Sequence, residues 1–155
     1  MTVLVDNTPG VLSNVVGLFS GRGFNIESLS VAATEDPEVS RMTITTQADA
    51  MMVEQIEKQL NKLINVIKIR DLTDPENIQR ELALITVTAK AGYKEEILRL
   101  VDLFRAKVID VGVDYYTIEI TGNPQKMENF FGLIKPFGIK KVARTGPVAL
   151  SRGAA

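Results

Sequence analysis

The chain has 155 residues, of which 45% are hydrophobic and 24% are charged, and its formal net charge is −1. Such a composition is that of one globular domain or two small ones, and a charge so near zero predicts binding neither to nucleic acid nor to an anionic membrane. Cysteine and histidine are absent, which excludes disulfides, structural zinc sites, thiol nucleophiles and imidazole general bases. Because no apolar run approaches a membrane span and the N-terminal segment is too short and wrongly charged for a signal peptide, we expect a cytoplasmic protein.

The first half of the sequence predicts the order strand, helix, strand, strand, helix, strand. The strands are expected at residues 1–5, 24–33, 41–46 and 66–70, and the helices at 11–19 and from Asp49 onward. Near Ser28 the apolar phase of the strand changes, which a β-bulge or a strand buried on both faces would explain. On the second helix, Glu54 and Lys58 are four residues apart, which predicts an ion pair on its exposed side.

A polar segment at residues 73–80 is interpreted as a linker between an N-terminal domain at 1–72 and a C-terminal domain at 81–155. At the far end of the chain, Val148 and Leu150 return the sequence to apolar residues after a turn. A disordered tail would not need them, so we expect this tail to dock on the protein.

The second half repeats the order of the first. Its strands are expected at residues 82–89, 108–113, 115–121 and 139–143, and its helices at 95–106 and from Asn123 onward. Two βαββαβ units offset by about 80 residues predict an α+β protein of two ferredoxin-like units in tandem, each an antiparallel sheet covered on one face by two helices. We expect apolar side chains on the open face of the first sheet, which would favour oligomerisation.

The turn before the first helix is a candidate binding site. Thr8 is a favourable N-cap and Pro9 suits the first helical position, while Gly10 leaves the first helical amides without a covering side chain. Unpaired N–H groups at the positive end of a helix dipole suit a small carboxylate. An ordinary helix cap explains the same residues, and the pattern alone favours it.

Amide and apolar side chains at the two ends of this helix complete the candidate site. Asn7 precedes the helix and Asn25 follows it, and their carbonyl oxygens could accept hydrogen bonds from an ammonium group. The predicted effector-binding residues are Asn7, Gly10, Val11, Leu12, Asn25 and Ile26. Together they suit a zwitterionic amino acid with an apolar side chain.

The remaining motifs do not predict catalysis. Asp110 with Asp114, and Glu35 with Asp36, lie among polar turn residues, where solvated surface charge is the ordinary arrangement. Residues 21–24 resemble a phosphate loop only loosely and follow a helix C-terminus, where the dipole has the wrong sign for phosphate. RNA-recognition domains of this topology carry aromatic residues on strands that here hold Ser, Val, Met and Thr. We expect a binding and regulatory module with no catalytic residues and no metal ligands.

Several blocks resemble a known family. Asn-Thr-Pro-Gly-Val-Leu at residues 7–12 and Arg-Gly-Phe-Asn-Ile-Glu-Ser-Leu at 22–29 look like the opening of an ACT domain. Further blocks are Ser-Arg-Met-Thr-Ile at 40–44, Phe-Arg-Ala-Lys-Val-Ile-Asp at 104–110 and Ala-Arg-Thr-Gly at 143–146. Taken in order along the whole chain, they resemble the small regulatory subunits of acetolactate synthase (acetohydroxyacid synthase).

This resemblance implies a regulatory subunit without an active site. Members of the family bind the large, thiamine-diphosphate-dependent catalytic subunit, raise its activity and make it sensitive to feedback inhibition by branched-chain amino acids, usually valine. The resemblance also implies a homodimer of ACT domains. It places effector contacts on Asn7, Gly10, Val11 and Leu12 of one subunit and on Asn25 and Ile26 of the other. Thiamine diphosphate, magnesium and FAD are expected only in the large subunit, and a photosynthetic eukaryote would place the complex in the plastid stroma.

Three other functions stay open. An ACT-type amino-acid sensor could control a different enzyme or a transcription factor, although the second unit and the Ala-Arg-Thr-Gly segment disfavour this. A stand-alone enzyme would turn over pyruvate without a partner. A structural dimerisation module would bind none of valine, leucine and isoleucine.

Overall fold

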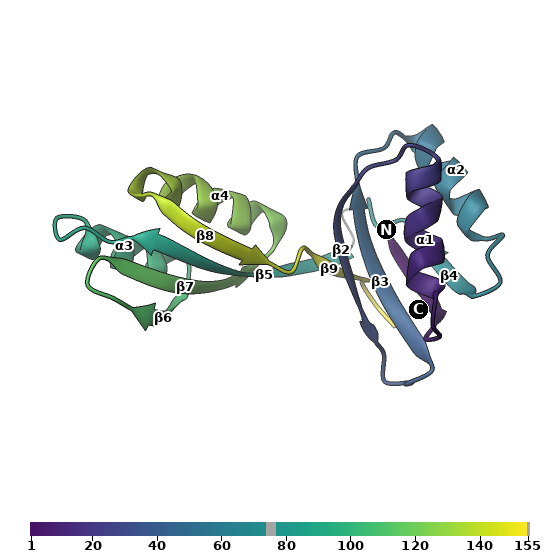
Figure 1. Cartoon of the computed structure of the whole chain (residues 1–155), viewed down its shortest axis with the longest axis horizontal. Helices are drawn as coiled ribbons and strands as arrows, with labels where there is room; N and C mark the ends of the chain where they lie inside the picture. The colour runs from purple at the N-terminus through teal and green to yellow at the C-terminus, as the bar shows by residue number, and fades with distance from the viewer. Residues whose placement is uncertain (74–76, 155) are drawn as a thin grey trace. The chain divides into compact units, whose positions relative to one another are not determined.

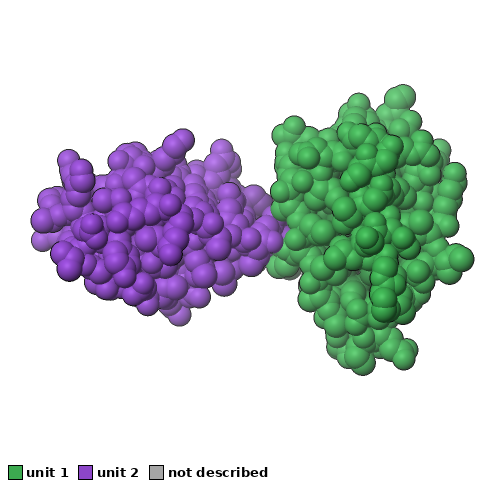
Figure 2. All heavy atoms as spheres, in the orientation of Figure 1, with its two compact units in different colours: residues 1–78, 148–155 green, residues 79–147 purple. Residues whose placement is uncertain are grey.

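The computed structural model describes residues 1–73 and 77–154, which form two compact units (Figure 2). The first unit comprises Met1–Ile78 and Val148–Ala155, and the second comprises Gln79–Pro147. The C-terminal segment thus groups with the first unit, whereas the sequence assigned it to the second. Strand β5 (Asn77–Thr88) begins inside the segment expected to be a linker, of which residues 74–76 lie outside the described residues.

The first unit is a four-stranded antiparallel sheet with two helices. Its elements are β1 (Thr2–Asp6), α1 (Val11–Gly21), β2 (Ile26–Ala33), β3 (Val39–Thr46), α2 (Ala50–Leu60) and β4 (Val66–Arg70). The strands are ordered β2-β3-β1-β4 with antiparallel neighbours, which confirms the expected βαββαβ unit. Figure 1 shows α1 and α2 on one face of this sheet.

Alternate residues of the two central strands form the core beneath these helices. Its sheet residues are Val3, Val5, Met42 and Ile44, and its helix residues include Val15, Phe19, Ile56 and Leu60, all at most 1% exposed. Burying each large apolar side chain contributes about 1.5–3 kcal/mol of transfer free energy. The helices are therefore held on the sheet mainly by this cluster.

Three local features of the first unit confirm sequence predictions. Asp49 caps α2, because its carboxylate accepts a hydrogen bond from the Met52 amide at 2.8 Å. Glu54 and Lys58 form the expected ion pair at 3.2 Å. The pairing of β2 with β3 shifts register just before Ser28, so a bulge explains the change of apolar phase.

The open face of this sheet is polar and basic near β4. Leu4 pairs with Arg41 of β3 on one side and with Lys68 of β4 on the other, and Thr2 pairs with Arg70. Since directly paired residues share a face, three cationic side chains lie on the face away from the helices. The prediction of an apolar open face is therefore wrong in this part of the sheet.

The C-terminal tail forms strand β9 (Val148–Ser151), which pairs with β5. Ala149 is 6% exposed, and its amide donates a hydrogen bond to Thr43 Oγ1 at 3.4 Å. The predicted docking of the tail is confirmed. The residue that becomes buried is Ala149, however, while Val148 and Leu150 stay about half exposed.

The second unit repeats the topology. Its elements are β5, α3 (Lys94–Leu103), β6 (Lys107–Val111), β7 (Tyr115–Gly122), α4 (Pro124–Ile134), the 3₁₀ helix η1 (Lys135–Phe137) and β8 (Ile139–Arg144), with strand order β6-β7-β5-β8. Its buried core is Ala83, Ile85, Val87, Ala89, Ile97, Val101, Tyr116, Ile118, Ile120, Met127, Phe130 and Ile134. Asn123 caps α4 as predicted, since its Oδ1 accepts a hydrogen bond from the Lys126 amide at 2.8 Å.

A buried carboxylate ties two neighbouring strands of this unit, β5 and β8, together. Glu81 of β5 is 6% exposed and accepts two hydrogen bonds from Arg144 of β8, from Nε at 2.6 Å and from Nη2 at 3.1 Å. The guanidinium lies 4.7 Å from the centre of the Phe131 ring. The hydrogen bond to Glu81 raises the pKa of Arg144, so the guanidinium stays protonated.

Candidate functional site

The turn that leads into α1 differs from the predicted cap. Gly10 is the N-cap residue, with φ 87° and ψ −12°, and the helix begins at Val11, so Thr8 is not the cap and Pro9 is not the first helical residue. Glycine adopts this left-handed backbone readily, whereas other residues are strained in it. In the described part of the chain no side chain caps the helix, and a Cβ built on Gly10 would meet no atom within 4 Å. The Val11 amide donates a hydrogen bond to the Thr8 carbonyl at 3.4 Å, so the donors that this end of α1 leaves for a ligand are the amides of Leu12 and Ser13.

Asn7 lies at the same end of α1, in an exposed position after β1. Its backbone amide donates a hydrogen bond to the Glu38 carbonyl at 2.8 Å, and its Nδ2 donates to the Pro37 carbonyl at 2.9 Å. These bonds hold the side chain against the turn between β2 and β3. With Nδ2 engaged, Oδ1 is the atom of Asn7 that can accept a hydrogen bond from a ligand.

Two apolar residues of the first helical turn differ in exposure. Val11 is 3% exposed and belongs to the core, whereas Leu12 is 42% exposed and presents an apolar side chain next to the Gly10 turn. This end of α1 thus offers backbone donors, one amide acceptor and one apolar surface. Such a combination suits a small amphipathic molecule that carries a carboxylate.

Asn25 and Ile26 lie beyond the other end of α1, at the start of the edge strand β2. The Asn25 carbonyl accepts a hydrogen bond from Oγ1 of Thr46, the last residue of β3. Asn7, by contrast, bonds to Glu38 immediately before β3 begins. The eight residues of β3 lie between these two points, a length of roughly 25 Å. The structure groups Asn7, Gly10, Val11 and Leu12, and within one chain it leaves Asn25 and Ile26 far from them.

A pocket of about 290 Å³ lies beside the first turns of α1. Its lining residues are Val11, Asn14, Val15, Lys62, Leu63, Ile64, Asn65 and Val66. Of the predicted site residues, Val11 alone lines it. The polar residues Asn14 and Asn65 were missed by sequence reasoning. The available signal for Asn14 was its position four residues after Gly10, which puts it one helical turn above the cap.

In the first unit, burial lowers the pKa of the N-terminal ammonium group of Met1. Raised pKa values occur in the second unit instead, where the charge of Asp110 raises the pKa of Tyr115 and the Glu81 hydrogen bond raises that of Arg144. Among the residues that the structure describes, there is no group of three or more histidine, cysteine, aspartate or glutamate residues that could hold a metal ion. None of the helices in residues 1–73 and 77–154 is long and apolar enough to cross a membrane.

Two family models match the chain, one over most of each unit. The model described as an AHAS small subunit-like ACT domain matches residues 1–68, and the model described as the small subunit of acetolactate synthase matches residues 80–153. Both units also have the expected ferredoxin-like topology. The protein is therefore of the class that carries an ACT domain followed by a second unit of the same fold.

Individual proteins that are similar to this chain show which family of this class it belongs to. An acetolactate synthase small subunit of Mycobacterium bovis is 54% identical over 153 residues, which cover 99% of this chain and 91% of that protein. A probable acetolactate synthase small subunit of Archaeoglobus fulgidus is 50% identical, with 99% and 96% covered. The acetolactate synthase small subunit from Thermotoga maritima, which has a crystal structure, is 42% identical to this chain in sequence. The two structures match with a TM-score of 0.88, and the match covers 99% of this chain and 96% of that chain. The chain belongs to the acetolactate synthase small-subunit family.

Proposed function

We propose that this chain binds the large catalytic subunit of acetolactate synthase, raises its activity and makes it sensitive to inhibition by valine or a related branched-chain amino acid. Membership of the small-subunit family supports the partner, because a small subunit implies a large one. The uncapped N-terminus of α1 beside Asn7 supports the amino-acid effector. In this proposal thiamine diphosphate, magnesium and FAD belong to the large subunit, and the chain itself contributes binding and not catalysis.

The effector site requires two copies of the chain. Strand β2 is at the edge of its sheet, so its outer backbone groups can pair with another strand. If two β2 strands pair antiparallel about a two-fold axis, the start of one lies against the end of the other. Asn25 and Ile26 of a second copy would then approach the turn at Pro37 and Glu38, to which Asn7 is bonded. A homodimer would thus bring Asn25 and Ile26 of one copy next to the helix N-terminus of the other.

Each part of valine has a chemical counterpart in this arrangement. The carboxylate suits the open amides at the start of α1, and the ammonium suits Oδ1 of Asn7. Leu12 and, from the second copy, Ile26 would bury the isopropyl group. Gly10 leaves room for the ligand, because its missing side chain would point into open space.

Inhibition follows if valine binds one dimer arrangement more tightly than another. A ligand can shift such an equilibrium only by its difference in affinity for the two states. Allosteric coupling free energies are typically about 1–3 kcal/mol, which corresponds to a change of roughly 5- to 150-fold in affinity. That range suffices for a graded response to valine.

The test is an assay of the large subunit with and without this chain across a valine titration. We expect higher activity when the chain is added and a progressive loss of that activity as valine rises. An Asn7→Ala chain should still activate but should need more valine for the same inhibition. Equal activity with and without the chain would reject the proposed partner, and activation that valine leaves unchanged would reject the effector role.

A further inference from the structure

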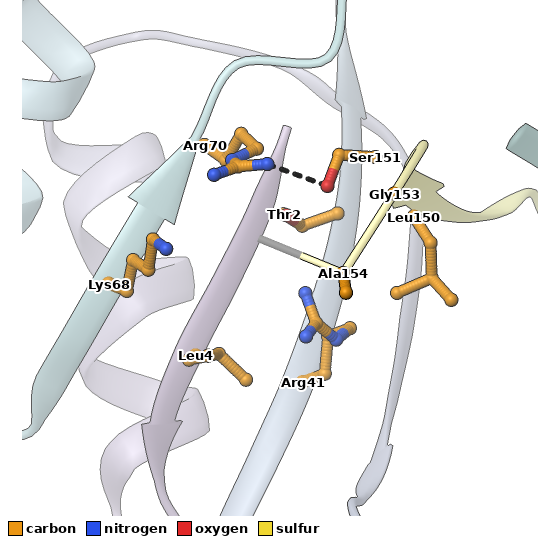
Figure 3. Close-up of a pocket in the computed structure, with 9 residues that line it drawn as sticks. All are labelled: Thr2, Leu4, Arg41, Lys68, Arg70, Leu150, Ser151, Gly153 and Ala154. Carbon is orange, nitrogen blue, oxygen red and sulfur yellow. Dashed lines mark hydrogen bonds between the residues drawn. The ribbon is translucent and has the colours of Figure 1, made fainter. Parts of the chain in front are cut away.

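We propose that the open face of the first unit's sheet holds a second ligand site, for a small phosphate-type oxyanion, formed by Arg41, Lys68 and Arg70 beneath the C-terminal tail. The structure has a pocket of about 210 Å³ at this place (Figure 3). It is lined by Thr2, Leu4, Arg41, Lys68, Arg70, Leu150, Ser151, Gly153 and Ala154. It lies on the face of the sheet opposite to α1 and is thus separate from the effector site.

Strand register brings the three cations together. Arg41 and Lys68 flank Leu4 on neighbouring strands, so their Cα atoms lie about 10 Å apart, at two strand spacings. Lys68 and Arg70 are two residues apart on β4, which puts their Cα atoms about 7 Å apart on the same face. Side chains as long as lysine and arginine reach a common point from such positions.

The C-terminal tail forms one side of this pocket. Leu150, Ser151, Gly153 and Ala154 of the tail line the pocket beside the cationic side chains, as Figure 3 shows. Arg70 Nη1 donates a hydrogen bond to Ser151 Oγ at 2.6 Å, which fixes the guanidinium at the edge of the pocket. Pockets for drug-sized ligands measure about 300–1,000 Å³, so this smaller one suits an ion or a compact metabolite.

Two cations of the pocket, Arg41 and Lys68, lack a nearby carboxylate partner among the described residues. None of the nine described residues that line the pocket is an aspartate or a glutamate. Like charges held close together repel one another, and an anion bound between them would relieve this repulsion.

The chemistry favours phosphate over a singly charged ion. A guanidinium offers paired N–H donors that match two oxygens of a phosphate, and a lysine ammonium adds a point charge. A doubly charged oxyanion also neutralises more of the local positive charge than chloride does. Contacts from β3, β4 and the tail to one anion would stabilise the docked position of the tail.

Titration calorimetry of the full chain with inorganic phosphate tests the proposal, with chloride at matched ionic strength as the blank. A separate titration with glycerol phosphate distinguishes a free ion from a phosphate ester. We expect saturable binding of at least one of them. Binding should weaken roughly tenfold in Lys68→Gln and in Arg41→Gln, as is typical when one charge-assisted hydrogen bond is lost.

Lys58→Gln is the matched control, because it removes the same charge from an exposed position of α2 that lines neither this pocket nor the one beside α1. Its affinity should equal that of the unmodified chain. Amide chemical-shift mapping of the unmodified chain with phosphate does not depend on any variant, and the shifts should centre on residues 41, 68, 70 and 150–154. Absence of saturable binding, shifts elsewhere, or equal losses in Lys58→Gln and Lys68→Gln would overturn the proposal.

Discussion

Asn7 and Asn25 are bonded to opposite ends of the same strand, β3. Asn7 N donates to the Glu38 carbonyl just before this strand, and the Asn25 carbonyl accepts from Thr46 at its end. With eight residues of strand between them, no small amino acid can touch both asparagines of one chain. A site that uses both therefore needs two copies of the chain.

Asn7→Ala is expected to weaken valine binding. The substitution removes Oδ1, and losing one hydrogen bond to an ammonium group costs about 1 kcal/mol or more, which is at least about fivefold in Kd. The backbone bond to Glu38 remains, so folding and binding to the large subunit should change little. Titration calorimetry with valine measures the effect.

Asn61→Ala serves as the control for this experiment. Asn61 is an exposed asparagine of the same unit, at the C-terminal end of α2. Its replacement should leave valine affinity unchanged. A Kd that is the same for Asn7→Ala and the unmodified chain would remove Asn7 from the effector site.

Gly10→Ala is expected to destabilise the first unit by about 1–2 kcal/mol, because a side-chain-bearing residue is strained at φ 87°. Gly17→Ala is the matched substitution. It also places a Cβ in open space, but Gly17 lies inside α1, where alanine is favoured over glycine by roughly 0.5–1 kcal/mol. Urea denaturation should therefore show opposite signs for the two variants. Equal stabilisation by both would mean that Gly10 is not left-handed in solution.

Much of the fold follows from local patterns. Tyr116, Ile118 and Ile120 are apolar at every second position of β7, a pattern that puts them on one buried face, and all three are at most 8% exposed. Asn123 before Pro124 predicted the start of α4. These signals are reliable because period-2 alternation and helix caps are set by neighbours in sequence.

Features that depend on tertiary placement were harder to predict. Thr8 has the chemistry of an N-cap, yet the left-handed conformation of Gly10 moves the helix start to Val11. Arg41 and Lys68 lie on strands that are far apart in the sequence. The alternation within each strand predicts only that these two side chains point away from the core. Long-range strand pairing puts them on one face, and the returning tail then covers that face. The apolar residues of the tail predicted that it docks, but neither the strand pairing nor the face that the tail covers has a local signature in the sequence.

Arg144→Met is expected to destabilise the second unit by about 1.5–3 kcal/mol, the range for hydrogen bonds to charged groups. It leaves the buried Glu81 carboxylate without its guanidinium partner. Lys140→Met on the same strand is the control, because its ion pair with Asp114 is long, at 3.9 Å, and exposed, and such pairs contribute about 0–1 kcal/mol. Thermal unfolding of the two variants should differ clearly. Equal melting temperatures would show that the Glu81–Arg144 pair contributes no more than a surface pair.

The ionisation of Tyr115 should depend on Asp110. The negative charge of Asp110 and its hydrogen bond from the Tyr115 hydroxyl, at 3.3 Å, raise the tyrosine pKa above its ordinary value of 10.0. Asp110→Asn should bring that pKa back toward 10.0, as followed by ultraviolet absorbance, with Tyr115→Phe identifying the signal. Because the folded-state pKa is the higher one, this contact stabilises the fold below pH 10, and its contribution is lost as the pH rises through the folded pKa. An identical tyrosine titration in Asp110→Asn and the unmodified chain would contradict the contact.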